Sequence, residues 1–149
     1  GNTGGARARD EMGDGVVSPE IEAKLMAAKR LFVDVDDTFI KHITSERVRG
    51  IFVVEGYTLN RPIAGAIQRW LEHGPPSPRT LIIWSLGGDG WAQKQWADFW
   101  PYPKWMTSNI EVMCIGKNQV VPQKGDLFID DAPLPSFASA TIHPREFEQ

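Results

Sequence analysis

Three short apolar runs in this chain are each followed at once by side chains that could bind a metal ion or take part in catalysis. The runs and their successors are 31–33 before Asp34-Val35-Asp36-Asp37-Thr38, 81–84 before Ser85, and 127–129 before Asp130-Asp131. A short apolar run bounded by polar residues is typical of a buried strand in a parallel sheet. Ligands of open α/β sheets bind beyond the carboxyl ends of the strands. We therefore expect two acidic clusters and one hydroxyl to meet at one edge of the sheet.

The segments between these runs supply the helices that a parallel sheet requires. The expected helices lie at about 18–29, 60–73 and 87–100, and a further strand lies at 110–115. Ser18 and Asn60 are placed to cap the first two helices through their side-chain oxygens. Strands that alternate with helices predict a layered α/β domain with a mostly parallel central sheet.

The length of 149 residues and the ordinary proportion of apolar residues fit one globular domain. Residues 1–17 are rich in Gly and charge without an apolar period, so we expect a flexible N-terminal arm and a single domain at 18–149. Cys114 is the only cysteine, and we find neither a signal-peptide pattern nor a bilayer-spanning run, so a cytoplasmic location is expected. A net charge of −3 gives no general reason to bind nucleic acid or membrane.

In their order along the chain, these residues resemble the motifs of the haloacid dehalogenase (HAD) superfamily of phosphatases, which use an aspartate as nucleophile. The motifs are a strand followed by Asp-x-Asp-x-Thr, a Ser or Thr after the next core strand, a Lys, and an acidic pair after another strand. They match 34–38, Ser85, Lys124 and Asp130-Asp131 in that order. The resemblance covers about 31–144 and extends to small phosphatases that are common in bacteria and phages. It implies a Rossmann-like, HAD-like fold.

The resemblance implies a magnesium-dependent phosphomonoester hydrolase. Asp34 would attack phosphorus and form an aspartyl-phosphate, and Asp36 would act first as general acid and then as general base. Ser85 and Lys124 would hold the phosphoryl oxygens and complete the catalytic set. The expected ligands of Mg²⁺ are Asp34, the backbone carbonyl of Asp36, Asp130, and Asp131 directly or through water. The expected substrate-binding residues are Thr38, Ser85, Leu86 and Lys124.

Two residues are candidates for the lysine of the third motif. Lys124 shortly precedes the last acidic strand and resembles the lysine of family members with that spacing. Lys117 follows the end of the preceding expected strand, and its purely structural interpretation is a solvated loop residue. We therefore expect Lys124 to serve the phosphoryl group, with Lys117 as the alternative.

Each motif also has a structural interpretation. Asp36 and Asp37 could form an Asx turn, and Ser85 could cap the following helix. A response-regulator receiver also groups acids, a hydroxyl and a lysine at strand ends, but its lysine comes last, whereas here the second acidic pair follows both lysines. The main alternative function is a catalytically silent HAD-fold scaffold that binds a phosphorylated ligand or a protein partner. Having both Asp34 and Asp36 argues against this scaffold, since a binding protein needs no acid/base.

The remaining candidate side chains are assigned to the fold. The three histidines share no metal-ligand spacing and are expected to lie outside the site; they are His42, His73 and His143. Most of the six tryptophans are expected to pack in the core, and one near the site could stack on a base or sugar.

The spacing of the motifs leaves no room for the cap domain with which this family usually selects substrates. The segment 39–59 suffices for a β-hairpin flap, and 86–109 suffices for a helix and a loop. The expected site is therefore open. It would admit a bulky phosphorylated substrate such as a nucleotide, a nucleic-acid end or a phosphoprotein. A second copy of the chain could instead cover the site around a small substrate, and no membrane partner is expected.

Overall fold

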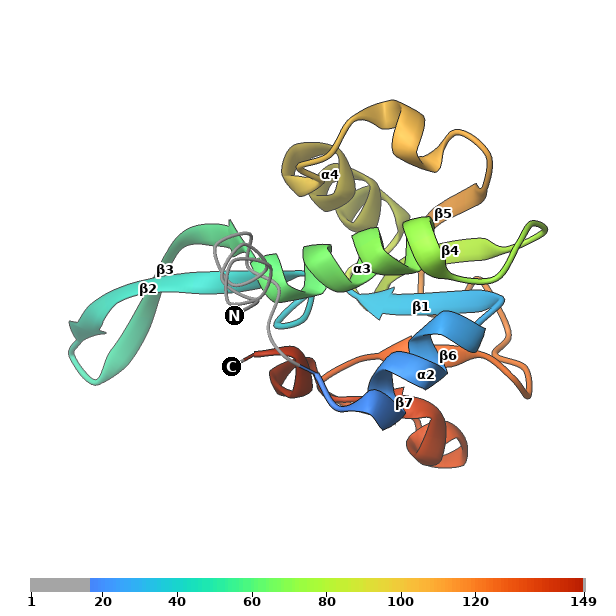
Figure 1. Ribbon diagram of the computed structural model, residues 1–149. Coiled ribbons are helices and arrows are strands. Elements are labelled where there is room, and N and C mark those ends of the chain that lie inside the picture. The colour runs from blue at the N-terminus through green and yellow to red at the C-terminus, as the bar shows by residue number, and fades with distance from the viewer. Residues whose placement is uncertain (1–16, 149) are drawn as a thin grey trace, which may run out of the picture.

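The computed structural model of this protein describes residues 17–148, without the side chains of 45–48 and 52–55. Its centre is a five-stranded sheet in which every strand pairing is parallel (Figure 1). In their order across the sheet, the strands are β5 (Glu111–Gly116), β4 (Thr80–Ser85), β1 (Arg30–Asp34), β6 (Leu127–Ile129) and β7 (Thr141–Ile142). The expected α/β domain with a mostly parallel central sheet is confirmed.

Successive side chains of the central strands point to opposite faces of the sheet, and the two faces are covered differently. Leu31 and Val33 of β1 join the larger core cluster, to which the α-helices contribute their buried residues. These helices are α2 (Pro19–Ala27), α3 (Arg61–His73) and α4 (Asp89–Phe99). Phe32 faces the other way, into a smaller cluster with Ile82, Trp84 and Phe128. Every described α-helix thus contributes to one face.

The second face is covered by a short 3₁₀ helix, η2 (Pro135–Ala140), and by loops rather than by an α-helix. Phe137 of η2 packs on Phe128, with the ring centroids 5.3 Å apart. No α-helix covers this face because the connecting segments 117–126 and 130–140 are short for an α-helical crossover. Aromatic rings compensate by filling this layer, and Phe32 lies 4.6 Å from Trp84 and 4.7 Å from Phe128 between centroids.

A β-hairpin leaves the body of the domain directly after β1 (Figure 1). It consists of β2 (Ile40–Val48) and β3 (Ile51–Leu59), which pair antiparallel. Arg49 and Gly50 join the strands with φ values of 51° and 79°, and two left-handed residues form the tight turn whose twist matches a hairpin. The hairpin expected within 39–59 is confirmed.

Asn60 follows the hairpin and stands at the N-cap position of α3, as expected, but its side chain makes no capping bond. Its amide nitrogen instead donates to the backbone carbonyl of Thr38 at 2.9 Å. Asn60 is buried, so its amide needs a partner, and the end of the hairpin brings the Thr38 carbonyl within reach. The predicted cap is therefore wrong, and Asn60 ties the base of the hairpin to the loop after β1.

The first helix agrees with its sequence signals. The Ser18 side chain accepts a hydrogen bond from the backbone N–H of Ile21 at 3.2 Å, and α2 begins at Pro19. The expected arm at 1–17 lies outside the described residues except for Val17, which packs against the larger core cluster and so belongs to the domain. No helix within 17–148 is long and apolar enough to cross a membrane.

Three short elements in the last third of the chain have no clear sequence signal. They are η1 (Lys104–Thr107), the two-residue strand β7 and η3 (Pro144–Phe147). β7 forms because Thr141 and Ile142 pair in register with Phe128 and Ile129. A strand of two residues is too short to show a period, so only its partner strand reveals it.

The register of the sheet places the carboxyl ends of the central strands in one row. Asp34 is paired with Trp84, and Ser85 is paired with Gly116. Val33 is paired with Ile129, so the next residues, Asp34 at the end of β1 and Asp130 directly after β6, lie side by side. Residues distant in sequence therefore meet at this edge.

Candidate active site at the carboxyl ends of the strands

Three carboxylates from two strand ends form a compact acidic group. Asp34, Asp130 and Asp131 each offer one oxygen, and these oxygens all lie within 4.8 Å of one another. Asp34 and Asp130 are buried, with 6% and 4% of their surface exposed, whereas Asp131 is exposed. The predicted proximity of the two acidic clusters is confirmed.

This donor set fits a hard divalent cation. Mg²⁺ prefers carboxylate oxygens, and ligand atoms ~2.1 Å from one ion lie at most ~4.2 Å apart, so slightly closer approach of the three oxygens would suffice. Two buried carboxylates side by side also require positive charge nearby. Asp36 was expected to add its backbone carbonyl, and that assignment stays a prediction.

The ammonium of Lys117 lies between the two buried acids. Its Nζ is 2.9 Å from Asp34 Oδ1 and 2.9 Å from Asp130 Oδ2. Lys117 is the residue directly after β5, and its backbone N–H donates to the Ser85 carbonyl at 3.0 Å, which continues the pairing of β5 with β4. The ammonium also lies 5.4 Å from the ring centroid of Trp84. Sheet register and an aromatic support thus direct this lysine into the site.

Lys124 is not brought to this group, and the expectation that it serves the site is wrong. It is exposed and stands before the amino end of β6, whereas the acids follow the carboxyl ends of the strands. Its neighbour Asp126 belongs to the opposite edge of the sheet, where it forms an ion pair with Arg30 at the start of β1, at 2.9 Å. Parallel strands carry residues before and after a strand to opposite edges, so Lys117 contacts the acidic group and Lys124 lies at the other edge.

Burial dominates the ionisation of the acidic group. It raises the pKa of Asp34 to about 7, the charge of Asp130 adds to the rise, and Lys117 opposes it. Burial likewise raises the pKa of Asp130, against the hydrogen bond from Lys117. Burial by itself lowers the pKa of Lys117, but its hydrogen bonds and attraction to the two acids outweigh that effect, so the pKa lies above its ordinary value. In the metal-free site, the ammonium of Lys117 therefore does not fully offset the burial of the two acids.

Hydrogen bonds fix the orientation of both buried carboxylates. The Thr38 hydroxyl donates to Asp34 Oδ2 at 3.2 Å, and Thr38 is itself fully buried. Asp130 Oδ1 accepts from the backbone N–H of Ala132 at 2.9 Å. Thr38 was expected to bind substrate, and its position beside Asp34 shows a role in holding that carboxylate.

Asp36 and Ser85 form a second pair beside the acidic group. The Ser85 hydroxyl lies 3.4 Å from Asp36 Oδ2, and the Trp91 indole N–H donates to the same oxygen at 3.1 Å. The Asp36 carboxylate thus bonds to neighbouring elements, whereas the Asx-turn interpretation requires a bond to its own backbone. The N-cap of α4 is Gly88, and Ser85 Oγ accepts from the Gly87 N–H at 2.9 Å, so the helix-capping interpretation of Ser85 is wrong.

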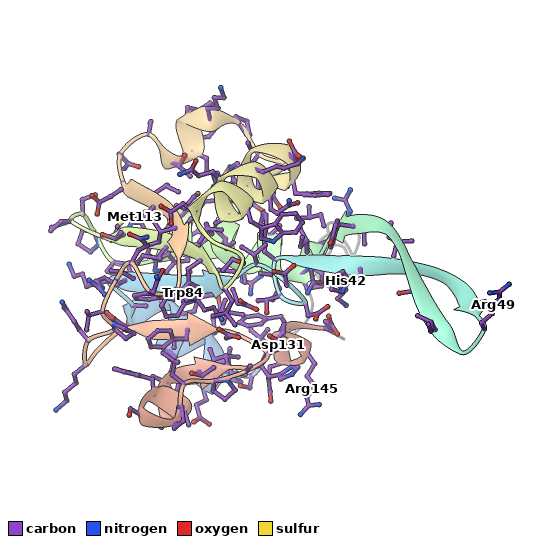
Figure 2. The ribbon with its side chains drawn as sticks, turned by 180° about the vertical axis from the view of Figure 1, so that it is seen from behind. His42, Arg49, Trp84, Met113, Asp131 and Arg145 are labelled. Atoms are coloured by element: carbon purple, nitrogen blue, oxygen red, sulfur yellow. The ribbon has the colours of Figure 1, made fainter. Side chains whose placement is uncertain are left out.

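Asp37 points toward the hairpin. Its backbone has a left-handed φ of 62°, and its Oδ1 lies 3.1 Å from Nδ1 of His42 on β2. Figure 2 shows His42 where the hairpin joins the body and Arg49 at the far tip.

His42 was expected to lie outside the site, and its contact is with Asp37 rather than with the acidic group. His73 is exposed and lies 3.7 Å from Glu72, and the His143 side chain caps η3, so neither is at the site.

A cavity of about 510 Å³ adjoins Lys117. The turn after β4 and the loop after β5 line it, and the lining residues are Leu86, Gly87, Gly88, Asp89, Lys117, Asn118 and Gln119. Leu86, an expected substrate contact, lies at this cavity with 88% of its surface exposed. Asp89 accepts a hydrogen bond from the Gly116 N–H at 2.6 Å, which joins the two loops.

Two residues of this site were missed or ranked second from the sequence. Trp91 was assigned to packing, and only the fold brings its N–H to Asp36. The signal for Lys117 was its place directly after a strand, which is the rule that identified Asp34, Ser85 and Asp130.

Comparison of this chain with family models, with curated proteins and with solved structures finds no significant match.

The raised pKa of Asp34 predicts a pH-dependent effect of Asp34→Asn on stability. In the metal-free protein, Asp34 ionises at about 7 when folded and near 3.8 when unfolded, so ionisation destabilises the fold increasingly as the pH rises through this window. Asn cannot ionise. Asp34→Asn should therefore raise Tm more at pH 8 than at pH 5.

Thermal unfolding followed by circular dichroism in the presence of a chelator measures this effect. Asp98→Asn is the matched control, because Asp98 is exposed on α4 and pairs only with Lys94 among the described contacts. A gain for Asp34→Asn that is equal at the two pH values, or larger at pH 5, contradicts the burial argument.

Proposed function

We propose that this chain is a divalent-metal-dependent phosphomonoester hydrolase of the haloacid dehalogenase type, in which Asp34 forms an aspartyl-phosphate. One observation carries the proposal: a buried acid pair bridged by Lys117 lies at the same sheet edge as a second acid bonded to Ser85. The first group suits metal and phosphate binding, and the second supplies a proton carrier. Such a combination exceeds what a structural ion pair requires.

Asp34, Asp130 and Asp131 are the residues that would hold Mg²⁺. The bound ion would offset the repulsion between these carboxylates and a phosphoryl group, which for two unit charges ~4 Å apart is ~4 kcal/mol at an effective dielectric of 20. Without a metal ion, Lys117 is the one cation among the described residues that contacts these buried acids.

The attack by Asp34 divides a very slow hydrolysis into two easier displacements. A carboxylate oxygen of Asp34 bonds to phosphorus while the bond from phosphorus to the leaving oxygen breaks. Thr38 orients the nucleophile through its bond to Oδ2. Lys117 and Ser85 stand beside Asp34, where an ammonium and a hydroxyl can bind phosphoryl oxygens.

Asp36 is the proton carrier of this mechanism. It gives a proton to the leaving oxygen in the first step and is left as a carboxylate. In the second step it takes a proton from the water that attacks the aspartyl-phosphate. This attack releases inorganic phosphate and regenerates the Asp34 carboxylate.

The cavity beside Lys117 is the space into which a leaving group would extend. Among the described residues, Lys117 is the only cation that lines it, and Lys117 already contacts two carboxylates. Asn118 and Gln119 offer uncharged amides, and Asp89 is acidic. This lining favours an uncharged, hydroxyl-rich leaving group such as a sugar or nucleoside, and it disfavours additional phosphates. The hairpin would serve as the flap of this site. A cytoplasmic location and a second copy that covers the site stay predictions from the sequence.

Asp34→Asn should abolish phosphomonoester hydrolysis and leave the fold intact, because an amide of nearly equal size cannot act as the nucleophile. The measurement is release of inorganic phosphate from a broad substrate panel with and without Mg²⁺. Asp98→Asn should keep wild-type activity. A variant that retains wild-type turnover refutes the nucleophile assignment, and a wild type that binds Mg²⁺ and phosphate but is silent on every substrate supports the scaffold.

The position of Lys117 predicts opposite results for two lysine variants. Lys117→Ala should lower kcat/KM about 100-fold, the usual effect of removing one charge-stabilising group at the reacting centre. Lys124→Ala should change it less than about twofold, because Lys124 is exposed at the other sheet edge. Near-UV circular dichroism verifies that both variants are folded. Loss of activity in Lys124→Ala alone would reverse the assignment.

The lining of the cavity predicts discrimination against a second phosphate. Glucose 6-phosphate should have a kcat/KM at least about fivefold above that of glucose 1,6-bisphosphate, since ~1 kcal/mol of repulsion corresponds to that ratio. Gln119→Lys places a cation at the exposed rim of the cavity and should reduce the ratio. Equal rates for the two substrates, or an unchanged ratio in Gln119→Lys, would place the leaving group elsewhere.

A further inference from the structure

We propose that Trp91 is a positioning residue that sets the orientation of the Asp36 carboxylate. This inference rests on the proposed function, in which Asp36 is the acid/base. Its basis is the hydrogen bond from the Trp91 indole N–H to Asp36 Oδ2, which is 3.1 Å long and joins α4 to the loop after β1.

The two donors to Asp36 select one of its oxygens. The Trp91 N–H and the Ser85 hydroxyl both contact Oδ2, and among the described residues no donor is found at Oδ1. When Ser85 turns its single hydroxyl proton to a phosphoryl oxygen, Oδ2 still accepts the Trp91 N–H. An oxygen that accepts this bond is a poor place for a proton, so the proton of the acid form belongs on Oδ1. A general acid must carry its proton on the oxygen that meets the leaving group. Trp91 therefore fixes which oxygen is catalytic.

Close contacts with Gly87 and Tyr57 hold the indole of Trp91. Gly87 approaches it so closely that an added Cβ would lie 3.1 Å from a ring carbon of Trp91, and Gly87 has no left-handed φ that would explain the glycine otherwise. Tyr57 of β3 also contacts the indole in an edge-to-face arrangement, with the ring centroids 5.4 Å apart. Gly87 thus leaves room for the indole and for the Ser85 hydroxyl, whose oxygen would lie 3.2 Å from the added Cβ.

The same contacts link the hairpin to the acid/base. Tyr57 lies 5.0 Å from His42 between ring centroids, and His42 contacts Asp37, the residue next to Asp36. The two adjacent acids are therefore tied to two different elements, Asp36 to α4 and Asp37 to β2. A hydrogen bond from Trp91 defines the position of Asp36 more strictly than packing alone would.

Other tryptophans of the chain show that this contact differs from ordinary core packing. The Trp70 indole N–H donates to the backbone carbonyl of Ala28 at 2.8 Å, within the core. Trp84 and Trp100 have no partner for their indole nitrogens among the described residues. Of these tryptophans, Trp91 is the one that donates to a carboxylate at the site.

The test compares Trp91→Phe with wild type on two phosphate esters in Mg²⁺. Phe keeps an aromatic ring but removes the N–H. A nitrophenyl ester needs little protonation of its leaving oxygen, whereas an alkyl ester needs a general acid, and kcat/KM reports on the steps up to the aspartyl-phosphate. Trp91→Phe should lower kcat/KM about tenfold or more on the alkyl ester and less than about threefold on the nitrophenyl ester.

Two variants make this comparison specific. Trp70→Phe is the matched control, since it removes an indole N–H that bonds to the backbone, and the ratio of the two esters should stay at the wild-type value. Asp36→Asn should shift the ratio in the same direction as Trp91→Phe and further. An equal loss on both esters in Trp91→Phe would overturn the inference in favour of a structural role, and no loss on either would overturn it outright.

A second readout separates failure of this inference from failure of the proposed function. In the metal-free protein, the indole N–H resonance of Trp91 can be assigned by its absence in Trp91→Phe. Removing the acceptor in Asp36→Ala should move this resonance upfield, with the other five tryptophans nearly unchanged. An unmoved resonance overturns the contact. A wild type silent on both esters overturns the proposed function and the catalytic role of Trp91 with it, while the resonance still reports whether the bond forms.

Discussion

The burial of Asp34 and Asp130 side by side is the constraint on which this end of the molecule depends. Two carboxylates in a low-dielectric environment repel one another, and each also loses hydration. Lys117 offsets both effects in part, because its ammonium contacts each acid at 2.9 Å. The raised pKa of Asp34 shows that one ammonium does not fully compensate. The register of β1 with β6 places both side chains at the same edge of the sheet.

The parallel sheet brings these residues together, and the loops after β1 and β6 orient the two carboxylates. Neighbouring parallel strands end at one edge, and the register places Asp34, Ser85 and Lys117 directly after or at the last paired residues. The aromatic layer on the second face then supports the lysine, since its ammonium lies over Trp84, which in turn packs on Phe32. A face that lacks an α-helix thus still contributes to the site.

The sequence was sufficient for the α/β class, the hairpin and the meeting of the two acidic clusters, because strand ends can be located from apolar runs. It was insufficient for the lysine, because spacing to the next acidic strand suggested Lys124, whereas the sheet separates residues before and after a strand. It also missed Trp91 and the true partner of Asn60. Both depend on where the hairpin and α4 lie in space, and no local period encodes that position.

The strands differ in how much unpaired backbone they present to other molecules. At one side the central sheet ends in β7, which has two residues, so little backbone is free there for another strand to join. The hairpin strands have nine residues each and pair only with one another in the described chain. A peptide or a second copy that adds a strand would therefore find a longer template on the hairpin than at the β7 edge of the sheet.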